Sequence, residues 1–531
     1  MTRVLGIEGT AWAASAAVFD SERDAIRMES EAYQPESGGI HPREAAEHMH
    51  GAVPRVIEAV LAGADDPIDA VAFSRGPGLG PCLRTVGTAA RALAGTLDLP
   101  LVGVNHMVAH LEIGRHQSGF SAPVCLNASG ANAHLLAFRG GRYRVVGETM
   151  DTGVGNAIDK FARHVGWDHP GGPKVENAAR EGEYVELPYV VKGMDFSFAG
   201  ITSAAQDAVD DGTPVEDVCR GLQETVFAML TEVSERALSL TGRDELVLGG
   251  GVGQNRRLRE MLATMCESRG ASFFAPEDRF LRDNAGMIAV LGAEMYEAGD
   301  TVAIEESAVR PDFRPDEVPV TWRSGEPAVE RADVESGEIR GAEAIVTMGD
   351  RVTKRRVGKT YRHPDLDAGL RENRTATEAR LTSLARRRGV PTPVLYDVDP
   401  TEARLVVERV GEADLAAGLT ERRVRQVAEG LAAIHDAGFV HGDPTTRNVR
   451  IAPGTDRVYL VDFGLGYHTE DVEDYAMDLH VFEGSVVGTS DDAETLCRAF
   501  EDGYREAGSG AVLDRLREIE GRGRYQGGED E

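Results

Sequence analysis

Short apolar runs alternate with longer amphipathic stretches along the first three fifths of the chain. The runs at residues 4–7, 13–19, 70–73, 101–104, 124–126 and 246–248 predict buried strands. Between them, residues 216–240 place apolar side chains at the spacing of one long helix. Strands that alternate with helices predict an α/β fold for this part of the chain.

The pattern changes near Pro311, where prolines begin to interrupt an acidic stretch that continues to about Glu338. Beyond it, residues 344–348, 405–408 and 458–461 predict strands, and residues 420–435 predict a helix. We therefore expect a first domain at residues 1–323, a linker at 324–340 and a second domain at 341–531.

The chain has 531 residues, 42% of them hydrophobic, and a net charge of -31. This composition excludes a disordered polymer and predicts folded domains with an acidic surface. Lysine is scarce and occurs only at Lys160, Lys174, Lys192, Lys354 and Lys359. Such a surface is typical of proteins in a salt-rich cytosol, because the Debye length falls to about 3 Å at 1 M salt. The negative charge therefore indicates no particular partner.

The cysteines are scattered singly, without a CxxC pair, at Cys82, Cys125, Cys219, Cys266 and Cys497. This argues against a disulfide framework or a thiolate zinc site. The start MTRVLGIEGT lacks a basic segment followed by an apolar core, and no apolar run reaches about 18 residues. We expect a soluble cytoplasmic protein with no membrane partner.

His106 and His110 are four positions apart in NHMVAH. On a helix both rings lie on one face, as two ligands of one divalent metal must. The spacing alone fits two ordinary histidines equally well. Met107 stands where the zinc-peptidase motif HExxH needs its glutamate.

Glycine-rich turns follow several of the predicted strands. They are SRGPGLGP at 74–81, NASGAN at 127–132, HPGGPKVE at 169–176 and LGGGVGQN at 248–255. Backbone amides in such loops can approach a phosphate or a sugar closely. One loop is as easily a tight turn, but four in one domain favour a nucleotide-shaped ligand.

In order along the chain stand HPREAAEH, SRGPGLGPCLR, NHMVAH, SGAN, GNAIDKFAR, PGGPKVE, FSFAGI, GGGVGQN and RDNAGM. This series resembles the universal threonylcarbamoyl transferase family, the catalytic subunit of the KEOPS complex, over about residues 1–323. The resemblance implies the two-subdomain actin-like ATPase (ASKHA) fold, with the ligand in the cleft between the subdomains.

The resemblance also implies the site residues. His106, His110 and Asp283 would bind the metal, either iron or zinc, and Asn127 stands where the family usually carries a Tyr that can approach it. Threonylcarbamoyl-AMP would be held by Asn127, Ala128, Ser129, Gly130, Ala131, Asp159, Gly172, Glu176 and Asn255. Taken alone, Asp159 and Glu176 read equally well as solvated charges.

Glu8 is a departure from related folds. Many actin-fold ATPases carry an aspartate at this position of the first turn, and here the sequence is GIEGT. The change suits a family that does not hydrolyse ATP in this cleft, so we expect the first domain to be a transferase.

The second domain carries the marks of a kinase. Asp443 and Asn448 in HGDPTTRN have the spacing of a catalytic loop, and Asp462-Phe-Gly follows a strand as a magnesium-binding segment should. Upstream, Lys354 is the candidate phosphate-binding lysine and Glu378 its partner. Gly341 is the one glycine of GAEA where signalling kinases have GxGxxG, and no APE segment follows.

These residues, with YRHPDLD and EDYAMDLHVFE, resemble the small atypical serine/threonine kinase of the same KEOPS complex over about residues 341–531. The resemblance implies a small bilobal protein-kinase-like α+β domain in which Asp443 accepts the proton. Lys354 and Glu378 would be catalytic, and ATP and magnesium would be bound by Gly341, Lys354, Asn448 and Asp462. In that family the domain acts largely as an ATPase that supports the transferase.

A basic stretch stands out against the acidic background. It comprises Arg351, Lys354, Arg355, Arg356, Lys359, Arg362, Arg386, Arg387 and Arg388. It is either a kinase lobe with its ATP contacts or, in part, a surface that meets tRNA phosphates.

The function that these resemblances imply is transfer of the threonylcarbamoyl group to the N6 amine of the adenosine 3′-adjacent to the anticodon. The acceptors are tRNAs that read codons beginning with adenine, and the expected partners are tRNA, threonylcarbamoyl-AMP and other KEOPS subunits. A metallopeptidase is one alternative, against which Met107 counts. A protein kinase with a ligand-binding regulatory domain is another, against which the missing APE segment counts.

Overall fold

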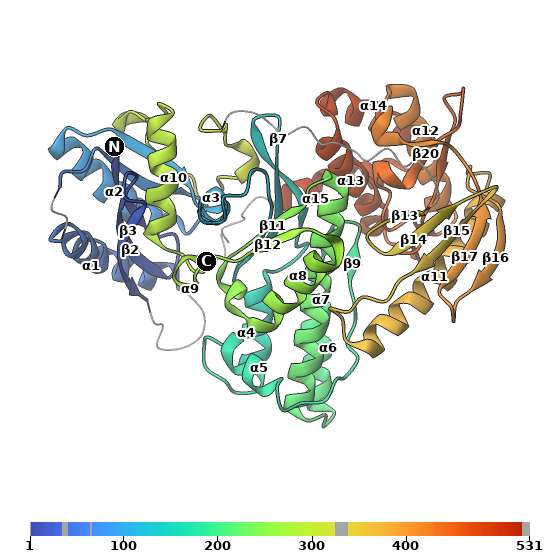
Figure 1. Ribbon diagram of the computed structural model, residues 1–531, viewed down its shortest axis with the longest axis horizontal. Helices are drawn as coiled ribbons and strands as arrows, with labels where there is room; N and C mark the ends of the chain where they lie inside the picture. The colour runs from blue at the N-terminus through green and yellow to red at the C-terminus, as the bar shows by residue number, and fades with distance from the viewer. Residues whose placement is uncertain (1, 34–40, 64–65, 324–337, 523–531) are drawn as a thin grey trace.

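The computed structural model describes residues 2–33, 41–63, 66–323 and 338–522. Three units lie side by side along the long axis (Figure 1). We call them the first unit, built on the sheet nearest the N-terminus, the central unit, and the C-terminal unit, which begins at residue 338.

The first unit is a five-stranded sheet in the order β3-β2-β1-β4-β5. Its strands are β1 (Arg3–Glu8), β2 (Ala13–Asp20), β3 (Ala25–Ala32), β4 (Ala70–Gly76) and β5 (Leu101–Asn105). β1, β2 and β3 form an antiparallel meander, while β4 and β5 run parallel to β1. Residues 4–7 of β1 and 70–73 of β4 are buried on both faces of the sheet, which explains why these two runs are continuously apolar.

The central unit repeats this topology. Its sheet has the order β12-β11-β6-β7-β8, so β6, β7 and β8 form the antiparallel meander and β11 and β12 run parallel to β6. The strands are β6 (Val124–Ala128), β7 (Ala133–Arg139), β8 (Arg142–Glu148), β11 (Glu245–Gly249) and β12 (Ser272–Phe274). The duplication agrees with the two-subdomain architecture expected from the sequence.

Helices cover both sheets. Those of the first two units are α1 (Pro42–Leu61), α2 (Gly80–Leu97), α3 (His106–Ser118), α4 (Val154–His164), α5 (Gly172–Ala178), α6 (Ala199–Asp210), α7 (Val215–Thr241), α8 (Arg256–Arg269), α9 (Asp278–Leu281) and α10 (Ala285–Glu297). Shorter elements are β9 (Val191–Lys192), β10 (Asp195–Phe196), η1 (Gly251–Gln254), η2 (Ile304–Glu306) and η3 (Pro315–Glu317).

One apolar core joins the first and central units. Alternate residues of β1 face opposite sides of the sheet, so Leu5 and Ile7 pack against α1 and α2 while Val4 packs toward α10. The core on the α10 side also includes α3 and residues of β6 and β11 from the second sheet. Helices α3 and α10 therefore lie in the layer between the two sheets.

Gly6 allows α10 to lie directly on β1. A Cβ at this position would come within 2.6 Å of the Ala285 carbonyl oxygen and the Ala289 nitrogen. Only glycine fits this approach, which fixes the start of α10 above the end of β1.

The C-terminal unit has a strand-rich part and a helical part. The strand-rich part is an antiparallel sheet in the order β13-β14-β15-β17-β16, with α11 packed on it. Its elements are β13 (Glu338–Arg340), β14 (Ala344–Met348), β15 (Arg351–Arg356), α11 (Pro364–Arg387), β16 (Leu395–Asp399) and β17 (Arg404–Glu408).

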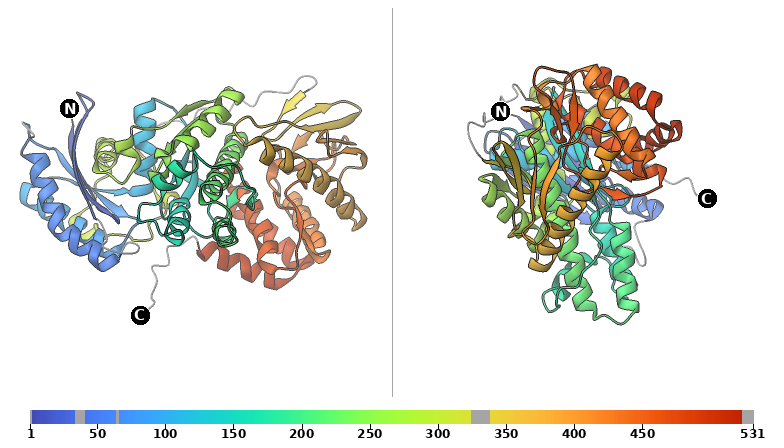
Figure 2. Two further views of the ribbon diagram at one scale, coloured as in Figure 1. Left: turned by 90° about the horizontal axis from the view of Figure 1, so that it is seen from below. Right: turned by 90° about the vertical axis from the view of Figure 1, so that its right-hand side faces the viewer.

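The helical part has its own apolar core, with Phe439, Phe463, Phe482 and Phe500 fully buried. Figure 2 shows its helices gathered at one end of the molecule. Its elements are β18 (Ala413–Asp414), η4 (Leu415–Ala417), α12 (Glu421–Asp436), β19 (Phe439–Val440), η5 (Thr446–Asn448), β20 (Val449–Ile451), β21 (Val458–Leu460), β22 (Tyr467–His468), α13 (Val472–Thr489), α14 (Ala493–Ala507) and α15 (Gly510–Arg522).

Most of the expected linker, residues 324–337, lies outside the described residues. Its last three positions form β13, which pairs with β14, so the C-terminal sheet begins at Glu338 rather than at Gly341. The division into two domains stays a prediction. Within the described part of the chain, no helix is long and apolar enough to cross a bilayer.

Candidate functional site

Helix α3 places two histidines on one face. Asn105 caps the helix, because its side-chain oxygen accepts from the backbone N–H groups of Met107 (3.0 Å) and Val108 (3.1 Å). The helix therefore begins at His106, and His110 follows one turn later. Their rings pack edge to face with centroids 4.8 Å apart.

Asp283 approaches this pair from the turn that precedes α10. It directly precedes Asn284, whose side chain accepts from the Met287 N–H (3.0 Å) and so caps α10. Helix caps at Asn105 and Asn284 thus fix the starts of α3 and α10. The packing of α10 on β1 and α3 brings the histidines and Asp283 together.

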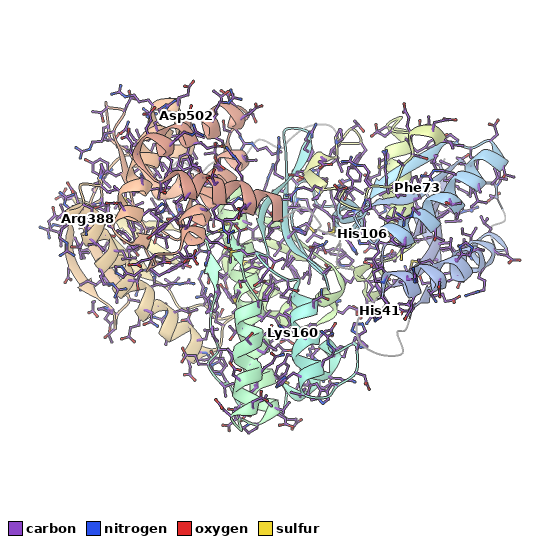
Figure 3. The ribbon with its side chains drawn as sticks, turned by 180° about the vertical axis from the view of Figure 1, so that it is seen from behind. His41, Phe73, His106, Lys160, Arg388 and Asp502 are labelled. Atoms are coloured by element: carbon purple, nitrogen blue, oxygen red, sulfur yellow. The ribbon has the colours of Figure 1, made fainter. Side chains whose placement is uncertain are left out.

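The three side chains converge on one point. Asp283 Oδ1 lies 3.3 Å from His106 Nε2 and 3.5 Å from His110 Nε2. One ligand atom from each residue lies within 4.8 Å of the others. Figure 3 shows His106 between the first sheet and the central unit.

Glu8 completes the cluster from the end of β1. Its Oε2 lies 3.2 Å from His106 Nδ1, and its Oε1 accepts from the Thr10 N–H (2.8 Å). From the sequence, Glu8 was expected only to mark a departure from ATP-hydrolysing relatives, and this contact was not predicted. The contact joins residues 98 positions apart, so no local pattern could reveal it.

The carboxylates of Glu8 and Asp283 give the cluster more negative than positive charge. Burial lowers the pKa of His106, but the carboxylates of Glu8 and Asp283 outweigh it and raise that pKa to about 10. Burial works against ionised Asp283, yet the two imidazoles hold the pKa of Asp283 well below its ordinary value. Two imidazoles and one carboxylate, from His106, His110 and Asp283, surround one point and are a donor set that fits a divalent transition metal. A glutamate behind one ligand histidine is the usual means of fixing its tautomer.

A test of Glu8 follows from this arrangement. We expect Glu8→Gln to weaken metal binding by about 10- to 100-fold, because the imidazole loses the carboxylate that orients it. Competition with a chelator measures the affinity. Glu29→Gln, on exposed β3, is the matched control. Equal affinities of Glu8→Gln and wild type would show that Glu8 does not support the metal.

Asn127 lies beside the cluster, at the buried end of β6. Its amide approaches the Met107 sulfur (3.6 Å), and its Oδ1 is buried with no hydrogen-bond partner in the described structure. The Gly249–Gly250 turn packs against both Asn127 and His110. The glycine-rich loops at 127–132 and 248–255 are therefore neighbours of the His106, His110 and Asp283 cluster.

The other residues expected to hold the adenylate form a connected series in the central unit. Ser129 and Gly130 accept, through their carbonyl oxygens, from the N–H groups of Gly155 (3.1 Å) and Asn156 (2.9 Å) at the start of α4. Asp159 on α4 accepts from the Gly171 N–H (2.7 Å). A Cβ at the next residue, Gly172, would meet nothing within 4 Å, so that loop is open to a ligand.

Glu176 and Asn255 meet at the start of α8. Glu176 Oε1 accepts from the Arg256 N–H (3.2 Å). Asn255 caps α8 by accepting from the N–H groups of Arg257 (2.9 Å) and Leu258 (3.3 Å), and its Nδ2 donates to Gln223 on α7 (3.2 Å). Asn255 thus has a structural role in addition to the one expected from the sequence.

The expected kinase residues also come together in the C-terminal unit. Lys354 Nζ lies 2.9 Å from Glu378 Oε2 and 2.7 Å from Asp462 Oδ1. Lys354 and Arg356 hold the pKa of Asp462 down to about 2 against the effect of burial. Gly341 forms a tight turn, in which its N–H donates to the Ala344 carbonyl (2.9 Å).

Asp443 faces Asn448 across the catalytic loop. Asn448 Nδ2 donates to Asp443 Oδ2 (2.9 Å) and to the Asp443 carbonyl (2.8 Å). Burial raises the pKa of Asp443 to about 7, against the opposing charge of Arg236. A carboxylate and a cation site in this arrangement fit ATP with magnesium.

The basic stretch is divided by the structure. Lys354, Arg356, Lys359 and Arg362 are each paired with carboxylates and are largely shielded from solvent. Arg386, Arg387 and Arg388 lie at the end of α11, and Figure 3 shows Arg388 on the outer side of the C-terminal unit, away from His106. The first four are thus internal contacts, which favours the interpretation as a kinase lobe for that part of the stretch.

Comparison with known proteins places this geometry in a class. A family model described as tRNA N6-adenosine threonylcarbamoyltransferase matches residues 25–290, which include His106, His110 and Asp283. The fold and site therefore define a threonylcarbamoyl transferase that acts on tRNA.

Relatives match the whole chain. A Halobacterium salinarum protein is 70% identical over 529 residues, covering 99% of each chain. A Natronomonas pharaonis protein is 71% identical over 536 residues, covering 99% of this chain and 100% of its own. A Methanospirillum hungatei protein is 51% identical over 525 residues, covering 98% and 99%. Each bears the name "Probable bifunctional tRNA threonylcarbamoyladenosine biosynthesis protein". The chain belongs to this family of bifunctional tRNA threonylcarbamoyladenosine biosynthesis proteins.

Proposed function

We propose that residues 1–323 transfer the threonylcarbamoyl group from threonylcarbamoyl-AMP to the N6 amine of the adenosine 3′-adjacent to the anticodon. The acceptors would be tRNAs that read codons beginning with adenine, and the enzyme would work with other KEOPS subunits in the cytoplasm. The observation that carries this proposal is the convergence of His106, His110 and Asp283 beside the glycine-rich turn at Gly249–Gly250.

His106, His110 and Asp283 would hold one iron or zinc ion, which would polarise the bound donor when present. Asn127 offers its unpaired Oδ1 toward the same region. The open loop at Gly172 and the carboxylates of Asp159 and Glu176 would hold the nucleotide part, since carboxylates suit ribose hydroxyls. Their placement orients the carbamoyl carbon for attack by the adenosine amine. The new N–C bond forms as the C–O bond to AMP breaks.

The C-terminal unit would be an atypical kinase with a bilobal α+β fold that acts mainly as an ATPase supporting the transferase. Lys354, held by Glu378, would contact the phosphates, and Gly341 would lie over them. Asn448 and Asp462 would bind magnesium, which would neutralise the phosphate charge. Asp443 would orient the acceptor and take its proton.

Two alternatives fit less well. A metallopeptidase needs a general base beside the metal, and position 107 is a methionine whose side chain contacts Asn127. A protein kinase with a regulatory domain needs an open site for its protein acceptor. Here Arg236 of the central unit forms an ion pair with the side chain of Asp443. The contact therefore favours a small acceptor such as water.

The direct test combines the full chain, its metal, threonylcarbamoyl-AMP and unmodified tRNA, together with the other KEOPS subunits. We expect modified adenosine in the tRNA and release of one AMP per transfer. Proteolysis of an unfolded protein substrate by the same preparation would support the peptidase instead.

A second prediction separates the nucleotide site from the metal site. We expect Glu176→Ala to weaken binding of a non-hydrolysable adenylate analogue by about tenfold while the metal content is unchanged, because Glu176 approaches α8 rather than α3. Calorimetry and metal analysis measure the two quantities. Glu181→Ala, just beyond the same helix, is the control. Loss of metal with unchanged analogue affinity would reverse the assignment.

Asn255→Ala should act in the same direction but with a second effect. Because Asn255 also caps α8, its loss should lower the free energy of unfolding by about 1 kcal/mol. Asn255→Ser retains a capping oxygen, so it should restore stability without restoring the amide that faces Gln223.

A further inference from the structure

Arg236 crosses from the central unit into the C-terminal unit. It lies near the end of α7 and is 8% exposed. Its NH1 donates to Asp443 Oδ2 at 3.0 Å, and its NH2 donates to Glu343 Oε1 at 2.6 Å. A cation supplied by the first part of the chain thus contacts the catalytic loop of the second.

This contact fixes the carboxylate of Asp443. Arg236 and Asn448 both donate to Oδ2, so that oxygen is fully engaged. Oδ1 is buried and has no hydrogen-bond partner in the described part of the chain. The carboxylate is therefore held in one orientation through Oδ2, while its buried Oδ1 keeps an unused hydrogen-bonding capacity.

Charge balance at the interface does not by itself account for the position of Arg236. We call the surrounding ion pairs the interface network; it consists of Glu232, Glu235, Glu343, Lys359, Arg362 and Arg374. Within it, Glu232 is paired with Arg362 (2.6 Å) and Arg374 (3.1 Å). Glu343 is also paired with Arg374. Arg236 adds a contact to Asp443 that no other member of the network makes.

We propose that Arg236 is a positioning residue of the phosphoryl-transfer site, so that the ATP-hydrolysing site is completed by a side chain from the transferase half. This proposal rests on the ATPase role proposed above for the C-terminal unit. Arg236 acts through Asp443: it holds Oδ2, and Oδ1 takes a proton from the attacking water. The water oxygen forms the new bond to the terminal phosphorus as the bond between that phosphorus and the ADP oxygen breaks, and ADP leaves.

The test compares three variants of the full chain. Arg236→Met removes the charge and keeps most of the side-chain volume. Arg236→Lys keeps a cation. Arg236 also pairs with Glu232 (3.0 Å). Arg362→Met removes a cation from the same Glu232 but has no contact with Asp443, so it measures the cost of disturbing the interface network alone.

We expect Arg236→Met to lower kcat for ATP hydrolysis by about tenfold or more with KM for ATP changed less than about threefold, because a charge-assisted hydrogen bond to Asp443 is lost while the ATP contacts stay. Arg236→Lys should recover part of this loss, and Arg362→Met should retain a kcat close to that of wild type. Equal losses of kcat in Arg236→Met and Arg362→Met would overturn the proposal, and so would a normal kcat in Arg236→Met.

A measurement on the protein without nucleotide tests the role of Arg236 separately from the ATPase activity proposed for the C-terminal unit. Hydrogen exchange of residues 439–451 should be faster in Arg236→Met than in wild type, and unchanged in Arg362→Met. Unchanged exchange in Arg236→Met would show that the contact does not hold the catalytic loop. A wild-type protein that hydrolyses no ATP, even with tRNA and partner subunits, would instead contradict the ATPase role.

Discussion

Substitution of both His106 and His110 by alanine should remove the bound metal and abolish threonylcarbamoyl transfer. Each imidazole directs its Nε2 at Asp283, and one carboxylate cannot hold a transition metal alone. We expect metal content to fall to background and transfer to fall by about a thousandfold or more. Elemental analysis of the purified protein and modified nucleoside per tRNA are the measurements.

The two imidazoles are buried, so the double variant also leaves Glu8 and Asp283 without a positive partner. We expect a loss of a few kcal/mol in the free energy of unfolding for this reason. Asp283→Asn avoids the difficulty, because it keeps the shape of the side chain and removes its charge. It should lose metal and activity while remaining folded.

His116→Ala is the matched control for this experiment. His116 lies on the same helix, but its Nε2 pairs with Asp24 (2.7 Å) rather than with Asp283. It should retain metal and transfer activity. Normal metal content in Asp283→Asn together with normal transfer would show that the third ligand lies elsewhere.

Asp462→Ala should abolish ATP hydrolysis in the C-terminal unit. It should leave the binding of the metal and of the adenylate by residues 1–323 unchanged. Lys354 and Asp462 are 2.7 Å apart, and loss of the carboxylate removes the group expected to hold magnesium. ATP hydrolysis should fall by about a thousandfold or more, the scale for loss of one charge-stabilising part of such a site. Metal content and adenylate affinity should stay at the values of wild type.

Multiple-turnover modification of tRNA should also fall in Asp462→Ala, because one chain holds the two sites at an effective concentration that can reach the millimolar range. The rate per enzyme is measured over many turnovers with all partner subunits present. Asp397→Ala, an exposed position paired with Arg404 in the same unit, is the control. A rate equal to that of wild type would show that ATP hydrolysis does not support the transferase.

Periodicity alone was sufficient for the main elements of the fold. The apolar runs at residues 4–7 and 246–248 fall within β1 and β11, and the helix expected at residues 216–240 is α7. These elements have strong local patterns, since they are buried on most sides. The duplicated sheet order could not be read from periodicity, because it depends on pairings between distant strands.

The candidate site was likewise only partly predictable from local sequence patterns. The spacing of His106 and His110 predicted that both rings share a helix face, which is confirmed. Asp283 came only from family resemblance, since it meets the histidines through the packing of α10 against α3. Arg236 had no sequence signal at all: it lies 207 positions from Asp443, in a helix whose charged residues look like an ordinary solvated face. Arg362 differs from Arg236, because the sequence placed it in the basic stretch, which was interpreted either as a kinase lobe or in part as a surface for tRNA, and the structure buries it.

Helix α7 touches both sites. Gln223 accepts from Asn255 beside the nucleotide loop, and Arg236 donates to Asp443, about 20 Å further along the same helix at 1.5 Å per residue. One helix therefore contributes a side chain to each of the two candidate sites. Thermodynamic linkage then imposes a symmetry: whatever factor ATP in one half applies to the affinity for threonylcarbamoyl-AMP in the other, that donor must apply to the affinity for ATP. Neither ligand can be called the regulator of the other.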